Sequence, residues 1–336
     1  MHIAYIAHPT SSNAFYRAIG PMAALASRGH RVTRLPTEDP RPAGAAVEGC
    51  DLLLVHRFAE RRAQQLVHAA HAQGAAVVWD NDDDMGAIPK GTPAYRITGG
   101  MRWEQRLADM KRIFRLASRV TAPSATLARR LQDAGAERVE VIENYIPDEV
   151  LHPRRPPHAG VVIGWIVGPE HQMDVDRIPI REALQRLLDE RADVHVVSVG
   201  LRLGLGGPRY RHLKFVPLLE LSAQAAGWDV AIAPIADVAF NRSRSSIKLK
   251  EYAAAGTPWL ASPIGPYAGL GERQGGRLVA DDRWHEQLVR LIDKPRDRRK
   301  LGRHAAKWAA GETISKHAQR WEACFRAAVE QTPVAA

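Results

Sequence analysis

FNRSRSSIKLKEYAAAGTPWLAS, residues 240–262, carries the pattern that decides the fold class. Ser245 or Ser246 can cap a helix here, and the Gly-Thr-Pro at 256–258 ends that helix before the apolar strand WLAS. Another apolar run, VAIAPIA at residues 230–236, precedes the segment. A strand, a helix and a further strand in this order predict one unit of a parallel sheet with a covering helix.

The same alternation extends outward over almost the whole chain. Apolar runs predict strands at 2–8, 31–36, 51–57, 75–81, 119–124, 138–145, 161–168, 194–200 and 213–219. Helical periodicity lies between them, at 14–27, 59–72, 101–118 and 174–189, and three more helices are expected within 284–330. Strands that are apolar on both faces and alternate with helices indicate parallel sheets covered on both sides.

LHPRRPPHAG, residues 151–160, has no periodicity and is rich in proline and positive charge, so it predicts a linker. We therefore expect an α/β protein of two doubly wound Rossmann-like domains, 1–152 and 160–312. A C-terminal helix at 313–336 would follow, with packing back on the first domain as one possibility. Ligands of such folds bind at the carboxyl ends of the strands, so the interdomain cleft is the expected site.

The composition, 336 residues with 45% hydrophobic and 25% charged, is that of a globular protein long enough for two domains. The two cysteines, Cys50 and Cys324, match no metal-ligand spacing and fit a reducing compartment. Neither a signal peptide nor an apolar run of membrane-spanning length is recognisable. We expect a cytoplasmic protein, with peripheral contact at the inner face of the membrane left open.

The formal net charge of +10 favours phosphate-bearing partners: nucleic acid, anionic lipid or nucleotide. The expected helix at 101–119 concentrates part of this charge on the side away from its apolar stripe. Its arginines are Arg102, Arg106, Arg112, Arg115 and Arg119. A solvated helix face is the ordinary interpretation, and a basic track for lipid phosphate or nucleic acid is the functional alternative.

Lys248 and Glu251 lie one helical turn apart on the helix that opens near Ser245. A helix amino end at the carboxyl edge of a sheet, with a lysine nearby, can hold a phosphate group. A carboxylate one turn further can accept hydrogen bonds from both hydroxyls of a ribose. The alternative is an ordinary solvated ion pair three residues apart.

This stretch resembles the donor-binding signature of GT-B nucleotide-sugar glycosyltransferases of the family 4-like group, in the bacterial form F-N-x-x-x-S-x-x-K-x-x-E-Y-A-A-x-G-x-P. SNAFYRAIGPMAAL at 12–25 and LASRGHRVTRL at 25–35 resemble the first helix and second strand of the same proteins, so the resemblance covers both domains. It implies a metal-independent, hexosyltransferase-like enzyme that retains anomeric configuration. Its co-substrate would be a UDP or GDP sugar, and no other cofactor is implied.

The resemblance also implies which residues hold the donor. Glu251 would bind the ribose, and the remaining donor-binding candidates are Lys248, Ser246, Ser245, Asn241, Gly168 and His171. The commoner family pattern has a glutamate where this chain has Ser243, so Asn241, Arg242 or Arg244 would supply the missing contact. An arginine there would stabilise the leaving diphosphate by its charge. A surface-loop histidine is the alternative for His171.

Acceptor-binding candidates lie at or after the carboxyl ends of the first, third and fourth expected strands. They are Ser12, Asn13, Tyr16, Arg17, Arg57 and Asp83. Simple helix capping is the alternative for Ser12 and Asn13, and a solvated strand end is the alternative for Arg57.

VVWDNDDDM, residues 77–85, places four carboxylates directly behind an apolar strand. Alternating aspartates suit a hard cation, and aspartates also end strands and form turns. Because the resembled enzymes neutralise the diphosphate with cationic side chains, no metal site is expected. The catalytic candidates are Asp82, Asp80 and Arg242, and one aspartate of the 80–84 cluster could act as a general base.

The expected function is transfer of a sugar to an acceptor hydroxyl, with a glycan or lipid-linked glycan as the first choice of acceptor. Two alternatives remain open. The basic charge favours a modified nucleic-acid base as acceptor, and Ser243 at the position of the common glutamate favours a non-catalytic binding protein. The sequence does not indicate the oligomeric state.

Overall fold

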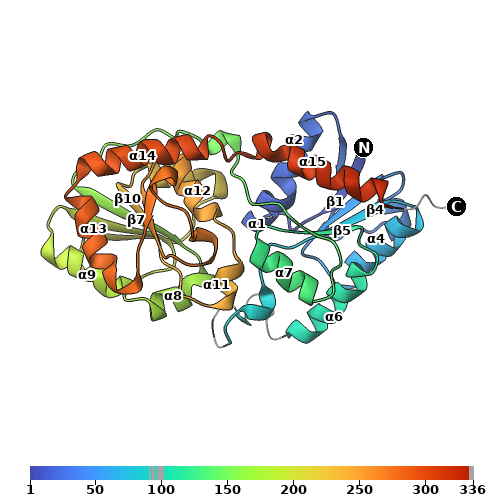
Figure 1. Cartoon of the computed structure of the whole chain (residues 1–336), viewed down its shortest axis with the longest axis horizontal. Coiled ribbons are helices and arrows are strands. Elements are labelled where there is room, and N and C mark those ends of the chain that lie inside the picture. Colours follow the sequence, from blue (N-terminus) through green and yellow to red (C-terminus); the bar gives the residue numbers. More distant parts are fainter. Residues whose placement is uncertain (91, 93–94, 97–101, 333–336) are drawn as a thin grey trace.

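The computed structural model describes residues 1–90, 92, 95–96 and 102–332, and it forms two α/β lobes (Figure 1). In the described residues each lobe contains a six-stranded sheet whose paired strands are parallel. The N-terminal sheet has the order β2-β1-β3-β4-β5-β6, and the C-terminal sheet has the order β12-β11-β10-β7-β8-β9. The prediction of two doubly wound domains is therefore confirmed.

The strands of the first sheet are β1 (His2–Ile6), β2 (Arg31–Arg34), β3 (Leu52–His56), β4 (Ala76–Asp80), β5 (Arg119–Ala122) and β6 (Val139–Val141). Its helices are α1 (Ser12–Ala14), α2 (Gly20–Ser27), α3 (Ala43–Ala46), α4 (Arg61–Ala72), α6 (Trp103–Phe114) and α7 (Ala125–Asp133). A π-helical turn, Phe15–Ile19, joins α1 to α2, so the helix expected at 14–27 is continuous but locally widened.

The strands of the second sheet are β7 (Val161–Val167), β8 (Val194–Gly200), β9 (Tyr210–Leu213), β10 (Val230–Ala233), β11 (Trp259–Ala261) and β12 (Gly276–Leu278). Its helices are α8 (Gln172–Arg177), α9 (Ile180–Glu190), α10 (Leu221–Ala226), α11 (Ala239–Ser243), α12 (Ile247–Ala254), α13 (Trp284–Ile292) and α14 (Pro295–Ala309). The chain ends with α15 (Ile314–Glu330).

Alternating residues of the central strands feed two cores on opposite faces of each sheet. Leu53 and Val55 of β3 pack with α4, α6 and α7, whereas Leu52 and Leu54 pack with α2 and α15. In the second sheet Ile163 packs with α9 and α13, and Val162 packs with α10. Since both faces are covered, the central strands have no polar face, which is the pattern that the sequence presents.

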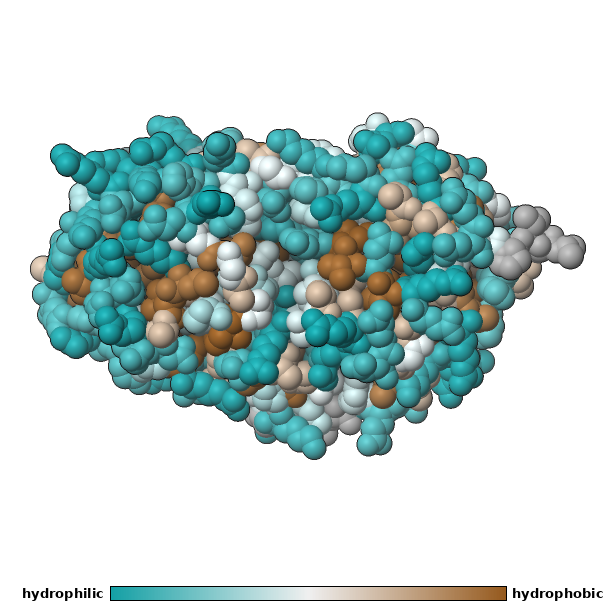
Figure 2. Space-filling model, in the orientation of Figure 1, coloured by the Kyte–Doolittle hydropathy of each residue, from teal (hydrophilic) through white to brown (hydrophobic). Residues whose placement is uncertain are grey.

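The chain passes between the lobes twice. Residues 151–160 form an extended linker, and α15 returns from the C-terminal lobe to pack on α2 and β4 of the N-terminal lobe (Figure 1). Buried Lys250 of α12 links the segments that precede the two crossings. Its Nζ lies 3.0 Å from Glu143 Oε2, 2.9 Å from Asn144 O and 2.7 Å from Glu312 Oε2. Hydrophilic residues dominate the face of both lobes shown in Figure 2.

Two predicted elements differ in the structure. The strand predicted at 213–219 is wrong: β9 ends at Leu213, and Pro217 begins a 3₁₀ turn at Leu218–Glu220, where proline cannot donate a ladder hydrogen bond. The helix predicted at 101–119 is shorter, Trp103–Phe114, and residue 101 lies outside the described residues. No helix among the residues that the model describes is both long and apolar enough to span a membrane.

The strand orders also locate the expected ligand site. The order reverses between β1 and β3 in the first sheet and between β7 and β10 in the second. Loops that leave these strands diverge to opposite sides of the sheet, which opens a crevice at the carboxyl ends. The segments that follow β1, β3, β7 and β10 are therefore the places where binding residues are expected.

Candidate functional site

A cavity of about 620 Å³ lies between the two lobes and is lined from both. Its N-terminal wall contains residues 9–13, Tyr16, Asp82 and Asp83, while residues 168–170, Arg244, Ser245, Lys248 and Glu251 contribute to the opposite wall. This volume is typical of a site for a small organic ligand.

α12 presents Lys248 and Glu251 to this cavity from adjacent turns. Lys248 Nζ donates to the Ile166 carbonyl at 2.8 Å, at the end of β7. Burial lowers the pKa of Lys248 and raises the pKa of Glu251, and each of the two charges opposes the effect of burial on the other. The pair is thus partly buried in the wall of the cleft and does not lie on a solvated helix face.

The three serines just before α12 lie in different environments. Ser245 lines the cavity and its Oγ accepts a hydrogen bond from Asn144 Nδ2 at 3.0 Å. Ser246 occupies the N-cap position, but its hydroxyl makes no capping bond within the described part of the chain. Ser243, at the position of the commoner glutamate, is buried and donates to Phe240 O at 2.8 Å, while its carbonyl accepts from Ser124 of the other lobe at 2.6 Å.

Arg242 and Arg244 diverge although they are two residues apart. Arg242 pairs with Asp237 at 2.5 Å on the surface, and the cavity lining formed by the described residues does not include it. Arg244, which follows the end of α11, lines the cavity and donates to Glu170 Oε1 at 3.2 Å. Of the arginines considered from the sequence, Arg244 is therefore the one placed to stabilise a charged ligand.

The loop after β7 supplies Gly168 and Glu170 to the same wall. A Cβ atom on Gly168 would lie 2.2 Å from Glu170 Oε2, so glycine lets this carboxylate fold back over the loop. Burial opposes the charge of Glu170, but His171, Arg244 and Lys248 outweigh burial and lower its pKa to about 2. An anionic side chain thus occupies the cationic part of the cleft. Glu170 was missed from the sequence, where it had no pattern beyond its place after a strand.

The facing wall is built by the loop after β1 and the π-helical turn. Ser12 and Asn13 line the cavity, and Asn13 Nδ2 donates to Asp83 Oδ2 at 2.9 Å. Tyr16 donates its hydroxyl to Glu251 Oε1 at 2.5 Å, across the cleft. Burial and the neighbouring Glu251 raise the pKa of Tyr16 well above its usual value, so the phenol remains a donor.

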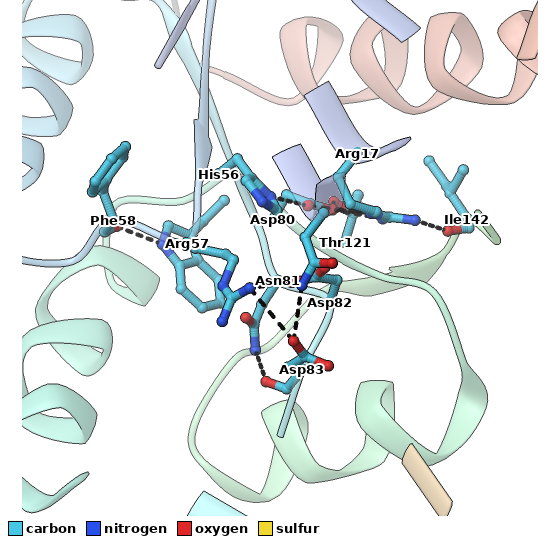
Figure 3. A network of polar contacts seen from close by, with 12 residues as sticks. Arg17, His56, Arg57, Phe58, Asp80, Asn81, Asp82, Asp83, Thr121 and Ile142 are labelled. Carbon is cyan, nitrogen blue, oxygen red and sulfur yellow. Dashed lines mark hydrogen bonds and ion pairs between the residues drawn. The ribbon is translucent and has the colours of Figure 1, made fainter. Parts of the chain in front are cut away.

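Arg17 and Asp80, predicted to contact substrate, are both fully buried in the N-terminal lobe. Asp80 pairs with Arg17 at 2.6 Å, and it also accepts hydrogen bonds from His56 at 2.8 Å and Thr121 at 2.5 Å (Figure 3). Burial opposes the charge of Asp80, but Arg17 and His56 hold its pKa at about 2. Neither Arg17 nor Asp80 is among the described residues that line the cavity, so the geometry gives them a supporting place beneath it.

Asp82 and Asp83 lie next to this network and face the cavity. Arg57 lies between them, 3.3 Å from Asp82 Oδ1 and 3.4 Å from Asp83 Oδ2 (Figure 3). Arg57 has a φ of 65°, a conformation that costs an ordinary residue about 1–2 kcal/mol and that concentrates at functional sites. Burial and the charge of Asp82 raise the pKa of Asp83 to about 6.

The acidic loop is thus divided among cationic partners. Asp80 pairs with Arg17, Asp82 and Asp83 pair with Arg57, and Asp84 pairs with Arg130 of α7. Within the ranges that the model describes, no group of three or more His, Cys, Asp or Glu side chains is arranged to hold a metal ion.

Asn241 and His171 are buried behind the cleft instead of lining it. Both contact Asp174, a residue that the sequence did not single out. Other lining residues missed from the sequence are Asn144, Lys214, Phe215 and Tyr267. The carboxyl-end rule could have indicated Asn144, which follows β6, whereas Tyr267 reaches the cavity only through the path of the chain after β11.

The raised pKa of Asp83 predicts that Asp83→Asn stabilises the protein at pH 8. The pKa of Asp83 is about 6 in the folded protein and near 3.8 when the chain is unfolded, so between these values only the folded state retains the proton. Stability therefore falls as pH rises toward 6, and above 6 the charge costs about 1–3 kcal/mol that asparagine removes. Urea denaturation at pH 8 and pH 4 measures this, with a smaller difference at pH 4. Exposed Asp189→Asn is the control, and equal stability of Asp83→Asn and wild type at pH 8 would contradict the assignment.

No family model and no curated protein matches this sequence. Solved structures do resemble it in fold. Sucrose-phosphate synthase from Thermosynechococcus elongatus superposes with a TM-score of 0.70 at 14% identity, over 97% of this chain and 98% of that one. HepE from Anabaena in complex with UDP superposes with a TM-score of 0.69 at 15% identity, over 97% of this chain and 100% of that one.

A structure described as a putative UDP-N-acetylglucosamine 2-epimerase from Listeria monocytogenes also matches, with a TM-score of 0.61 at 12% identity over 99% of this chain and 98% of that one. At these identities the likeness shows the fold alone, which is the two-domain GT-B fold. Because proteins described as a synthase and as an epimerase share it, the activity must be argued from the site.

Proposed function

We propose that the protein is a glycosyltransferase that moves a sugar from a nucleotide diphosphate sugar to an acceptor hydroxyl. The observation that carries this proposal is the placement of Lys248 and Glu251 on adjacent turns of α12, facing an interdomain cavity. In this proposal the C-terminal lobe binds the donor and the N-terminal lobe binds the acceptor. The UDP bound in the HepE structure, which has the same fold, supports a nucleotide as the ligand class.

Lys248, Arg244 and the amino end of α12 would together neutralise the donor diphosphate. Both side chains line the cavity, and charge-assisted hydrogen bonds to phosphate are among the strongest that proteins make. This arrangement supports chemistry without a metal ion, as the resemblance implies. Glu251 Oε1 accepts a hydrogen bond from the Tyr16 hydroxyl, and Oε2 would accept hydrogen bonds from the ribose. The expected nucleotide part of the donor is UDP or GDP.

Phe215 supplies a further feature of the donor wall. Its side chain lines the cavity and is 80% exposed, which is unusual for a phenylalanine. A nucleotide base is planar and can stack on such a ring. We therefore place the base beside Phe215 and Val216, in the segment after β9.

The acceptor hydroxyl would be received by Asp82, Asp83 and Asn13. Asp83, with a pKa of about 6, is close to the range in which a carboxylate accepts a proton effectively at neutral pH. Retention of anomeric configuration remains part of the proposal on the family resemblance. A glycan or lipid-linked glycan, which offers many hydroxyls, is the proposed acceptor.

A nucleotide panel read by thermal melting tests the donor site. At a ligand concentration about 100 times Kd, UDP or GDP should stabilise the folded state by about 2.7 kcal/mol and raise Tm by several degrees. Glu251→Gln should lose most of this shift, because an amide is a weaker acceptor for two hydroxyls than a carboxylate. Exposed Glu182→Gln on α9 is the matched control. Equal shifts in wild type and Glu251→Gln would contradict the ribose assignment.

A modified nucleic-acid base as acceptor is the second candidate, supported by the net charge of +10. Binding of DNA or RNA would then weaken steeply as salt increases, because bound phosphates release counterions. A non-catalytic binding protein is the third candidate, supported by buried Ser243 at the position of the common glutamate. Slow hydrolysis of UDP-glucose or GDP-mannose by the wild type would favour an enzyme over this third candidate.

A further inference from the structure

Arg244 is held in the cleft by two polar neighbours, the imidazole of His171 and the carboxylate of Glu170. Its guanidinium lies 3.2 Å from His171 Nε2 and 3.2 Å from Glu170 Oε1. The ring of Phe240 packs against it at 5.6 Å. Of the two polar partners, Glu170 lines the cavity, whereas His171 is buried at 1% exposure behind it.

The protonation of His171 follows from these contacts. A guanidinium can only donate, so His171 Nε2 must accept, and the ring proton must then be on Nδ1. Nδ1 lies 2.6 Å from Asp174 Oδ2, which accepts a hydrogen bond from the Nδ1–H group. Burial, and then the positive charge of Arg244, lower the pKa of His171, which favours the same neutral form.

Asp174 is fixed on its other side. Its Oδ1 accepts the backbone N–H of Ala236 at 2.7 Å and Asn241 Nδ2 at 2.8 Å. Both donors belong to the segment after β10 that leads to Arg244. The buried carboxylate therefore ties the loop after β7 to the loop that carries the arginine, and orients the imidazole between them.

We infer that Asp174 and His171 form a positioning pair that holds the Arg244 guanidinium in the cavity as a ligand for the donor diphosphate. This inference rests on the proposed function. His171 and Asn241 then act through Arg244 and not by contact with the donor. Without a ligand, Arg244 pairs with the Glu170 carboxylate, and in this inference the donor diphosphate replaces that carboxylate as the partner of Arg244.

The two neighbours of Arg244 should respond in opposite directions when they are replaced. His171→Gln removes the imidazole that links Asp174 to Arg244, and we expect roughly tenfold weaker binding, the usual effect of losing one hydrogen bond to a charged group. Glu170→Gln removes the competing carboxylate while keeping its size, and we expect severalfold tighter binding. A purely structural role for this loop predicts weaker binding, or none, for both variants.

Isothermal titration calorimetry with UDP, GDP and inorganic pyrophosphate measures these changes, after melting curves show that each variant is folded. The decisive comparison repeats His171→Gln in an Arg244→Ala background, where a residue acting through Arg244 has no further effect. The same tenfold loss in both backgrounds, or no loss in either, would overturn the inference. Wild type that binds none of the three ligands would instead refute the proposed function, and the inference would fall with it.

The pH dependence adds a readout that a structural role does not provide. Protonation of His171 would turn Nε2 into a donor facing Arg244, with Glu170 and Asp174 as the neighbouring anions and Trp165 at the ring edge. Because the pKa of His171 is lowered, this protonation occurs at a pH below the usual range of histidine, and there wild-type affinity should fall more steeply than the affinity of His171→Gln. Dividing the affinity of wild type by the affinity of His171→Gln at each pH cancels the effect of ligand protonation. If this ratio did not change with pH, the role assigned to neutral His171 would be contradicted.

Discussion

Lys248→Met is expected to weaken the binding of a nucleoside diphosphate about 100-fold. A charge-assisted hydrogen bond contributes about 1.5–3 kcal/mol, and the loss is at the upper end here because Lys248 is partly buried and lines the cavity directly. Methionine keeps the length and apolar stem of lysine, so packing against the end of β7 is largely preserved. Isothermal titration calorimetry with UDP and GDP measures the change.

Lys307→Met on the exposed face of α14 is the matched control, since it removes the same charge far from the cavity lining. It separates a local loss from a general effect of net charge on binding a polyanion. An equal loss of affinity in both variants would show that the protein attracts nucleotides only through its overall charge. If Lys248→Met bound the nucleotide as tightly as wild type, the assignment of the diphosphate site to α12 would be wrong.

Asp80→Ala is expected to destabilise the fold by about 3–5 kcal/mol. It would leave the Arg17 guanidinium charged and buried, with hydrogen bonds only to Asn144 at 3.0 Å and to the Ile142 carbonyl among its described partners. Desolvation of an unpaired charge is the source of the cost. Urea denaturation at pH 7 measures the change in the free energy of unfolding.

The exposed pair of Asp237 and Arg242 provides the control for this effect. Asp237→Ala removes a carboxylate from an arginine at 2.5 Å, as Asp80→Ala does at 2.6 Å, but in contact with solvent. Water replaces the lost partner there, so stability should not change measurably. If both substitutions had the same small effect, the buried pair of Asp80 and Arg17 would not stabilise the acceptor wall, contrary to our expectation from its burial.

The sequence predicted the fold well because burial on both faces leaves a plain signal. Runs such as DLLLVHR and VVIGWIVG have no polar alternation, and proline-rich 151–160 separates two sets of them. The failed strand at 213–219 has the same apolar content, but there Phe215 and Leu218 line the cavity instead of a core. Apolar content alone does not distinguish a binding wall from a strand.

The candidate site was predicted at the level of loops more than of single residues. The carboxyl-end rule identified the segments after β1, β4 and β10, which carry Asn13, Asp83 and Lys248, and all three residues line the cavity. Side-chain direction within those loops depends on tertiary structure. In the π-helical turn, Tyr16 reaches across the cleft while its neighbour Arg17 turns into the lobe beneath.

The choice between Arg242 and Arg244 illustrates the same limit. α11 ends at Ser243, and the two arginines on either side of that end point to the surface and to the cavity. Sequence spacing alone gave no means to place the end of so short a helix. The partner that orients Arg244, His171, comes from more than seventy residues away in the chain.

A crystal structure of the protein with UDP or GDP tests the central claim most directly. We expect the diphosphate within hydrogen-bonding distance of Lys248 and Arg244, the ribose at Glu251 and the base beside Phe215. The competing position is the groove of about 610 Å³ that Arg155, Arg299 and Arg303 line on the C-terminal lobe. A nucleotide bound in that groove, with the interdomain cavity occupied by solvent alone, would contradict the account.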